Sequence, residues 1–266
     1  MKKKRADVLL FEKGLVDSRE KGKRIIMEGS VYVGNLRVDK PGDKFDENVE
    51  IYIKSNPLNY VSRGGLKLEK AIAEFNLELN NAVAMDIGSS TGGFTDCMLQ
   101  NNASKVYAVD VGYGQLDWKL RNDSRVVVME RTNIRNISSV DGIDLLDFIS
   151  IDVSFISLKL VLPVAKSLLK ENGEIVALVK PQFEAGKEKV GKKGIIKDKA
   201  IHIEVLDSII NFCNSINLGI KGLSFSPITG AKGNIEFLIY LVNNKDYAID
   251  KKSIRDIVEE GHMLLK

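Results

Sequence analysis

The stretch MDIGSSTGGFTD, at residues 85–96, decides how we expect this chain to fold. An apolar run ending at Ile87 meets a turn that contains Gly88, Gly92 and Gly93, and a segment with helical spacing follows. Glycines let the backbone of such a turn approach a ligand closely, and the start of the helix favours negative charge. We therefore predict that the turn binds a nucleotide-like cofactor. The alternative is an ordinary glycine-rich turn in an α/β domain.

The spacing of these glycines separates the cofactors that use such a turn. A P-loop needs a lysine after its last glycine, whereas Phe94 follows Gly93 here. A dinucleotide fingerprint needs G-x-G-x-x-G, and here the second glycine is displaced. Methyltransferases that use S-adenosylmethionine follow a looser pattern, with one acidic residue on the strand and another at the end of the next strand. Asp86 and Asp110 occupy these two positions. The pattern favours S-adenosylmethionine. An acidic residue roughly 20 positions past the loop, here Asp110, is placed to accept hydrogen bonds from ribose hydroxyls.

The predicted cofactor-binding residues are Asp86, Gly88, Ser89, Ser90, Thr91, Gly92, Gly93, Phe94, Asp110 and Val111.

Strand-like and helix-like segments alternate from residue 82 to the end of the chain. The predicted strands are 82–87, 105–110, 126–129, 148–152, 174–180, 220–225 and 235–242, and the predicted helices are 63–75, 92–100, 157–169, 198–215 and 252–265. Such alternation predicts a doubly wound, Rossmann-like α/β sheet. The last two strands follow each other closely, which suits an antiparallel edge.

The composition is that of a soluble globular protein, with 44% hydrophobic and 28% charged residues. Cys97 and Cys213 form no C-x-x-C pair, and His202 and His262 are isolated in the sequence. We therefore predict neither a disulfide framework nor a metal site. No apolar run approaches the roughly 20 residues of a membrane helix, and the basic start leads into no secretory signal. The expected location is the cytoplasm, with no membrane partner.

The first 54 residues are predicted to form a small α+β domain. Two helices, at 6–13 and from about residue 17 to 28, precede a hairpin signal around Gly34 and a strand at 49–53. The segments RADVLL (5–10), SRE (18–20) with RII (24–26), and GSVYVG (29–34) resemble the S4-type RNA-binding domain. All of the net charge of +3 lies within the first 60 residues, and this suits a polyanionic partner.

The S4 resemblance and the charge imply an RNA partner for this domain. The residues expected to contact phosphates are Arg5, Arg19, Lys23 and Arg24. The alternative is a small appendage with incidental charge. We place a linker at 55–61 and a second domain at 62–266.

Two apolar strands predicted in the second domain end in a polar residue. Asp152 ends the run at 148–152 and Lys180 ends the run at 174–180. Ligands of doubly wound sheets bind beyond the carboxyl ends of the strands, so both side chains are expected beside the cofactor. The residues after Asp152 lack the prolines typical of enzymes that methylate exocyclic amines. Methylation at C5 of cytosine needs a nucleophilic cysteine at the end of a strand, and neither cysteine of this chain fits that position. A lysine and an aspartate suit a hydroxyl acceptor instead.

Nearly the whole chain resembles the TlyA family, or hemolysin A-like proteins, which have an FtsJ-type ribosomal RNA 2′-O-methyltransferase domain. The matching motifs are SRGGLKL (62–68), DIGSSTGGFTD (86–96), IDVSFISL (151–158), VKPQFE (179–184) and GNIEF (233–237). The resemblance implies a catalytic tetrad of Lys67, Asp152, Lys180 and Glu236, and an acceptor at the 2′-hydroxyl of cytidine in ribosomal RNA of one or both subunits. Family members often have Arg-x-Trp-Val between the domains, whereas residues 58–61 here are LNYV.

Two features of the site stay open at the level of sequence. Lys180 could accept the hydroxyl proton as a neutral amine, or it could steer the hydroxyl oxygen while charged. The basic segment 183–199 is predicted to close over the RNA backbone through Lys187, Lys189, Lys192 and Lys193, with a flexible surface loop as the alternative.

Three functions are therefore compared. The favoured one is an S-adenosylmethionine-dependent methyltransferase that acts on ribosomal RNA or on ribosomal subunits. The alternatives are an RNA-binding protein with an inactive methyltransferase fold, and a membrane-active hemolysin. The sequence predicts no oligomeric state.

Overall fold

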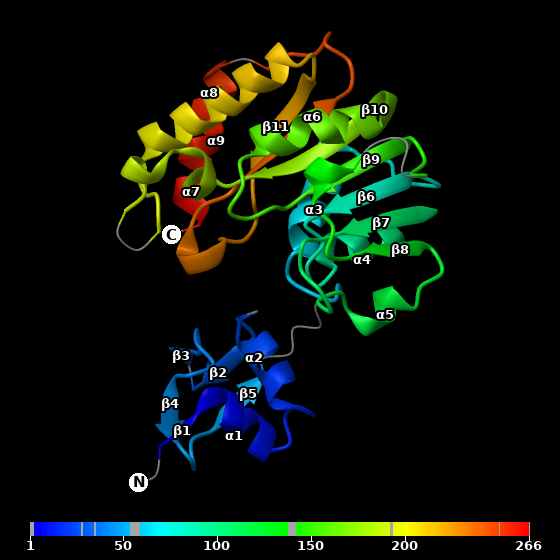
Figure 1. Ribbon diagram of the computed structural model, residues 1–266. Helices are drawn as coiled ribbons and strands as arrows, with labels where there is room; N and C mark the ends of the chain where they lie inside the picture. Colours follow the sequence, from blue (N-terminus) through cyan, green and yellow to red (C-terminus); the bar gives the residue numbers. More distant parts are fainter. Residues whose placement is uncertain are drawn as a thin grey trace. The chain divides into compact units, whose positions relative to one another are not determined.

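The computed structural model describes residues 3–27, 29–34, 36–53, 59–137, 142–191, 194–249 and 251–265. The chain divides into two compact units, Met1–Arg63 and Gly64–Lys266 (Figure 1). The linker predicted at 55–61 falls partly outside the described residues, since 55–58 belong to none of these ranges. The predicted domain boundaries stay a prediction.

The N-terminal unit is a small α+β domain. Its elements are β1 (Lys3–Arg5), α1 (Ala6–Glu12), α2 (Arg19–Met27), β2 (Val31–Val33), β3 (Leu36–Arg37), β4 (Lys44–Asp46) and β5 (Ile51–Ile53). Buried Leu9, Leu10 and Ile26 join the two helices to the β2 and β5 side of the core. Ser18 caps α2, because its Oγ accepts from the backbone N–H of Lys21 at 3.2 Å. The predicted helices and hairpin are present, whereas the short β1–β4 pair was not predicted.

The C-terminal unit contains, among the described residues, a seven-stranded sheet in the order β11-β12-β10-β9-β6-β7-β8. The strands are β6 (Val83–Ile87), β7 (Lys105–Val109), β8 (Val126–Met129), β9 (Leu146–Ile151), β10 (Leu169–Val179), β11 (Gly219–Phe225) and β12 (Phe237–Val242). Strands β8, β7, β6, β9 and β10 are parallel, and β12 is antiparallel to both β10 and β11. The doubly wound α/β prediction is confirmed. The predicted antiparallel pair is also present, but only β11 lies at the edge.

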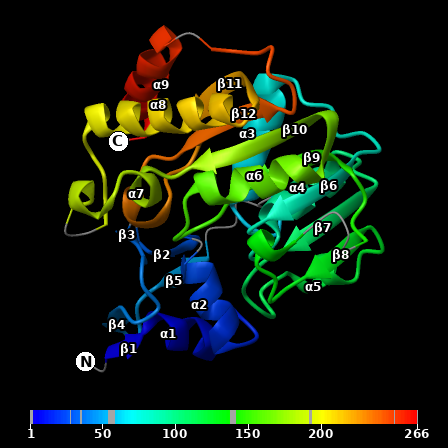
Figure 2. The same ribbon diagram turned by 45° about the horizontal axis from the view of Figure 1, so that its top comes forward.

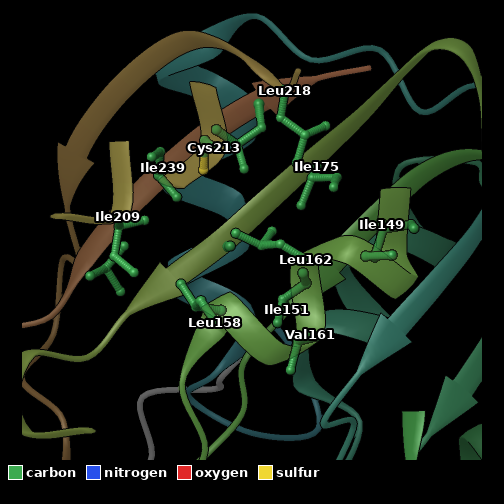
Figure 3. Packing of buried hydrophobic residues seen from close by; sticks show 14 of the residues in the cluster. Ile149, Ile151, Leu158, Val161, Leu162, Ile175, Ile209, Cys213, Leu218 and Ile239 are labelled. Atoms are coloured by element: carbon green, nitrogen blue, oxygen red, sulfur yellow. The ribbon is translucent and has the colours of Figure 1, made fainter. Parts of the chain in front are cut away.

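Helices cover both faces of this sheet (Figures 1 and 2). The helices are α3 (Gly65–Phe75), α4 (Gly93–Gln100), α5 (Trp118–Arg121), α6 (Leu158–Leu168), α7 (Pro181–Glu184), α8 (Lys199–Ser215) and α9 (Lys251–Leu264), with 3₁₀ turns at Ile134–Asn136, Lys187–Lys189 and Ala231–Gly233. On one face, α6, α8 and α9 bury a continuous apolar cluster against the strands. Figure 3 shows Leu158 and Leu162 of α6 in one buried cluster with side chains of the sheet such as Ile149, Ile151 and Ile175. Helices α3 and α4 lie on the other face, where Phe75 stacks on Tyr240.

The structure corrects one expectation about an individual segment and adds one contact that the sequence did not show. Strand β10 begins at Leu169, directly after α6, rather than at residue 174. The two histidines are not isolated in space, because α8 and α9 bring Nδ1 of His202 to 2.9 Å from Nε2 of His262. Burial, together with His262, lowers the pKa of His202 to about 4. Cys97 and Cys213 are both buried.

Candidate active site

A cavity of about 450 Å³ opens at the carboxyl ends of β6, β7, β8 and β9. This is the point where the chain reverses direction across the sheet, since β7 lies on one side of β6 and β9 on the other. Doubly wound sheets bind ligands at such a switch point. Among the predicted cofactor residues, Gly88, Ser90, Asp110 and Val111 line this cavity.

The other six predicted cofactor residues belong to the loop or to the elements beside it and do not line the cavity. These residues are Asp86, Ser89, Thr91, Gly92, Gly93 and Phe94. Gly88 has φ +86°, and a Cβ on it would lie 2.5 Å from the carbonyl oxygen of Asp152. Gly92 has φ +95°, and a Cβ on it would lie 2.2 Å from Cδ1 of Leu120. Glycine is therefore required where the loop meets the end of β9 and where it enters α4.

The loop's backbone donors are mostly engaged within the protein. The N–H groups of Gly88 and Ser89 donate to the carbonyl of Val109, at 2.8 and 3.1 Å. The N–H of Ser90 donates to Oδ2 of Asp110 at 2.8 Å, and Gly112 donates to its Oδ1 at 2.7 Å. These N–H groups are therefore already bonded within the protein. Gly88 of the loop and the carboxylate-bearing Asp110 remain as features that line the cavity.

Asp86 has a different role from the one that its position in the motif suggested. It is buried, and its Oδ2 accepts from the backbone N–H and the hydroxyl of Thr95, at 2.9 and 2.7 Å. Ser150 donates to its Oδ1 at 3.2 Å. Burial raises the pKa of Asp86 to about 7, although these hydrogen bonds oppose the shift. Asp86 therefore joins α4 to the middle of the sheet and does not line the cavity.

Four polar residues that line the cavity were not predicted as site residues: Gln115, Thr132, Asn133 and Ser154. Thr132 and Asn133 follow β8, and Oδ1 of Asn133 caps the 3₁₀ turn by accepting from the N–H of Arg135 at 3.1 Å. Their position just after the predicted strand at 126–129 was the available signal, since β8 is parallel to β7 and ends at the same edge.

The four predicted catalytic residues meet beside this cavity. Nζ of Lys67, on α3, lies 2.9 Å from Oε2 of Glu236 and 3.3 Å from Oδ2 of Asp152. Oδ1 of Asp152 lies 2.5 Å from Nζ of Lys180 as an ion pair. Lys180 also donates to Oγ of Ser154 at 3.0 Å. The four side chains form one connected network at the ends of β9 and β10.

Strand register explains how Glu236 reaches this network from a distant part of the sequence. Val179 pairs with Phe237 in the antiparallel β10–β12 ladder, so Glu236 lies beside Lys180. The carboxylate of Glu236 also lies against Gly230, where a Cβ would be 1.9 Å from its Oε1. The turn before β12 is therefore shaped around the carboxylate.

Burial and charge act in opposite directions on the pKa values of the network. Burial lowers the pKa of Lys67, but the carboxylates of Asp152 and Glu236 outweigh it and the pKa is raised above its ordinary value. Burial likewise raises the pKa of Asp152, but Lys67 and Lys180 outweigh it and the pKa is lowered. Both groups are therefore ionised at neutral pH. The buried network is held together by charge pairing.

A second cavity, also of about 450 Å³, adjoins the first and shares Phe155 and Ile156 with it. Phe155 is 91% exposed and has φ +64°, which is rare for a bulky side chain. Its ring lies 4.9 Å from that of Phe183, centre to centre. Strained residues of this kind gather at functional sites. The aromatic pair therefore marks the second cavity as a candidate for binding a flat group.

The predicted RNA-contacting residues of the N-terminal unit form local ion pairs. Nε of Arg5 and Nη2 of Arg19 contact the buried carboxylate of Asp7, at 2.9 and 3.3 Å. The arginine side chains themselves are 45% and 51% exposed. Lys23 pairs with Glu20 at 2.6 Å. Arg24 is exposed on α2.

The basic segment 183–199 is more ordered than a simple loop. It contains the end of α7 and the 3₁₀ turn Lys187–Lys189, and its Ile196 is buried. Asn234 anchors it, since Oδ1 accepts from the N–H of Ile196 at 3.0 Å and Nδ2 donates to Gly194 at 2.9 Å. Lys189 pairs with Glu204. The predictions for Lys192, Lys193 and the side chain of Lys187 lie outside the described residues.

Neither a metal-binding cluster nor a membrane-spanning helix is found in the described parts of the chain. No group of three or more His, Cys, Asp or Glu side chains there is arranged to hold a metal ion. None of the described helices combines the length and the apolar character needed to cross a bilayer.

Comparison with known proteins matches each of the two units to a protein family. The model of the FtsJ-like methyltransferase family matches residues 60–243, and that of the S4 domain matches residues 4–51. YqxC of Bacillus subtilis, provisionally named an rRNA methyltransferase, is 55% identical over 100% of this chain and 96% of its own. The 16S/23S rRNA (cytidine-2′-O)-methyltransferase TlyA of Mycobacterium tuberculosis is 36% identical over 97% and 96% of the two chains. A solved structure from Streptococcus thermophilus, described as a candidate hemolysin, aligns with a TM-score of 0.80 at 50% identity, covering 99% and 97% of the two chains.

Proposed function

Because this chain belongs to the FtsJ-like methyltransferase family, we propose that it transfers a methyl group from S-adenosylmethionine to the 2′-hydroxyl of a cytidine in ribosomal RNA. The observation that carries the proposal is the network of Lys67, Asp152, Lys180 and Glu236 beside the cavity of the glycine loop. The relative from Mycobacterium tuberculosis is named as a cytidine-2′-O-methyltransferase of ribosomal RNA, and this name supports the choice of acceptor.

The cavity at the switch point suits S-adenosylmethionine. A Cβ at Gly88 would clash with the end of β9, so only a glycine leaves this close passage open. We assign Asp110 to the ribose hydroxyls, and the apolar walls of Val111, Ile134 and Val153 to the flat base. When bound, the cofactor supplies an electrophilic methyl group. The protein's contribution is to hold the acceptor hydroxyl in line with that group.

Lys180 is the residue that we assign to the acceptor hydroxyl. Its Nζ is held between Asp152 and Ser154 at the end of β10. Asp152 connects it to Lys67, and Glu236 holds Lys67 from the other side. A ribose hydroxyl is a poor acid, so a fixed Nζ that contacts its oxygen improves both its orientation and its reactivity. Lys67 and Glu236 act as positioning residues for this contact.

Phe155 is the most exposed large apolar side chain that lines both cavities. A nucleoside whose ribose reaches Lys180 would place its base in the second cavity, against the rings of Phe155 and Phe183. Aromatic rings stack on nucleic acid bases without regard to sequence. A base turned out of the RNA would find an apolar surface there.

We assign RNA binding to the N-terminal unit and the basic segment. The side chains of Arg5 and Arg19 are about half exposed, while Asp7 fixes the orientation of their guanidinium groups. Such groups bind phosphates with little further loss of side-chain freedom. We extend the assignment to Lys23 and Arg24 of α2, and to Lys187, Lys189, Lys192 and Lys193 of the basic segment.

The experiment combines the full chain, radiolabelled S-adenosylmethionine and ribosomal subunits that lack 2′-O-methylcytidine. Digestion of the RNA to nucleosides should yield labelled 2′-O-methylcytidine. Lys180→Ala should abolish the label while it binds S-adenosylmethionine as the natural chain does, because Lys180 is outside the lining of the cofactor cavity. Near-normal turnover by this variant would contradict the assignment. RNA binding without methylation, or lysis of erythrocytes without either, would favour the alternative functions.

A further inference from the structure

We propose that Gln182 recognises the exocyclic amine of the target cytosine through its side-chain oxygen. The proposal rests on the proposed function and deepens it, because it explains how this active site would choose one pyrimidine over the other. It starts from a buried polar atom in the second cavity that the network around Lys180 does not use.

The side-chain oxygen of Gln182 is buried without a hydrogen-bond donor in the described part of the chain. A buried acceptor without a partner costs free energy, and such atoms in a folded protein call for an explanation. Gln182 lines the second cavity together with Phe155, Phe183 and Ser157. A ligand that places an N–H group in this cavity would remove the cost.

The position of Gln182 in the chain connects this acceptor to the chemistry. It lies two residues after Lys180, on the short helix α7. Glu184 of the same helix holds it in place, because its carboxylate accepts from the hydroxyl of Ser157 at 2.6 Å and from the N–H of Leu158 at 2.7 Å. A base stacked near Phe155 and Phe183 would therefore present its edge to Gln182 while its ribose lies toward Lys180.

The chemistry of the two pyrimidines is opposite at the relevant atom. Cytosine has an amino group at C4, which donates hydrogen bonds, whereas uracil has an oxygen there, which accepts them. In the side-chain orientation that the structure shows, the oxygen of Gln182 would accept from the amino group of cytosine and repel the oxygen of uracil. Sites built to bond a substrate N–H discriminate strongly against analogues that lack it, because the protein atom is then buried unpaired.

The test begins with the natural chain and the nucleotide that it methylates, mapped by mass spectrometry of the digested RNA. Three RNA fragments then carry at this position cytidine, uridine or the 2-pyrimidinone ribonucleoside, which is cytidine without its amine. We expect kcat/KM to fall about ten- to a hundredfold from cytidine to the 2-pyrimidinone analogue. Uridine should be methylated more slowly still. Equal rates on cytidine and the analogue would overturn the proposal without any substitution in the protein.

Substitutions locate the effect at Gln182. Gln182→Leu removes the acceptor, so it should lose a similar factor on cytidine and methylate cytidine and the analogue about equally. Gln182→Glu keeps an acceptor and should keep the preference for cytidine. Gln100→Leu, at an exposed glutamine of α4, is the control and should leave the preference unchanged.

The outcomes separate this proposal from the proposed function. Persistence of the preference for the amine in Gln182→Leu would mean that another group reads the base, and would overturn the proposal. Binding of S-adenosylmethionine by Gln182→Leu checks that the variant is folded. If the natural chain methylates no RNA, the proposed function itself fails and the recognition of cytosine fails with it.

Discussion

Replacing Glu236 by glutamine removes one charge from the buried network while it preserves the shape of the side chain. Glu236 is 3% exposed and its partner Lys67 is 9% exposed, with 2.9 Å between Oε2 and Nζ. At an effective dielectric constant of about 20, two unit charges at this distance attract each other by about 6 kcal/mol. Part of this is offset by the desolvation that the variant no longer requires. Breaking a buried pair from one side costs about 3–5 kcal/mol.

This cost predicts a large change in thermal stability. For a domain of roughly 200 residues, 1 kcal/mol corresponds to about 2–4 °C in Tm, so Glu236→Gln should unfold about 6–20 °C lower. Calorimetry on the full chain measures the shift for the C-terminal unit. Methyl transfer should fall at least tenfold because Lys67 loses its anchor. The affinity for S-adenosylmethionine should change little, since Glu236 is outside the lining of the cofactor cavity.

An exposed pair of the same length provides the control. Nζ of Lys105 and Oδ2 of Asp144 are also 2.9 Å apart, but the side chains are 38% and 55% exposed. Asp144→Asn should therefore cost no more than about 1 kcal/mol. If Glu236→Gln destabilises the protein no more than this control, burial does not strengthen the network and the reasoning is refuted.

Three further predictions follow from other contacts. Gly88→Ala should weaken S-adenosylmethionine binding at least tenfold by titration calorimetry, because its Cβ would lie 2.5 Å from the carbonyl oxygen of Asp152; Gly114→Ala, which has φ +69° but no atom within 4 Å of its Cβ, should not. The pKa of Asp86 is raised from 3.8 to about 7, so the stability that its protonated form contributes is present below pH 3.8 and is lost as the pH rises to about 7. Urea unfolding should show that the free energy of unfolding of Asp86→Asn, relative to that of the natural chain, increases by about 4 kcal/mol from pH 4 to pH 7, at about 1.4 kcal/mol per unit of pKa. A difference that stays constant with pH would contradict the raised pKa. Asp7→Asn should weaken RNA binding several-fold in a filter assay although it removes a negative charge, because its two arginines lose their fixed orientation; tighter binding would refute that role.

Local patterns in the sequence were sufficient to predict most of the fold. The alternation of apolar strands and helices identified the strands of the large sheet, because a buried parallel strand needs a continuous apolar run and a helix needs a 3.6-residue period. The glycine pattern located the cofactor loop for a similar reason, since positive φ at Gly88 and Gly92 is a property of the backbone itself. The ends of β9 and β10 identified Asp152 and Lys180 in the same way.

Other features of the site depended on contacts between distant segments. Asp86 matched the pattern of a cofactor residue, yet its carboxylate faces Thr95 and Ser150 on the α4 side of the sheet. Gln115 lines the cavity without any pattern that identified it, and Thr132 and Asn133 were signalled only by their position after the predicted strand at 126–129. The pairing of His202 with His262 likewise depends on how α8 packs against α9.

By itself, the sequence determined the fold class, the glycine loop and two of the proposed catalytic positions, because each follows from local backbone preferences and burial patterns. Glu236 and Lys67 entered the catalytic prediction only through family resemblance. Only the tertiary structure brings them to Asp152, because this requires the antiparallel register of β12 against β10 and the packing of α3 across the sheet. It also decided that the buried side-chain oxygen of Gln182 has no donor among the described residues, since this depends on every described segment around the cavity. Spacing along a chain encodes which residues are neighbours within an element, whereas the free energy of packing decides which elements meet.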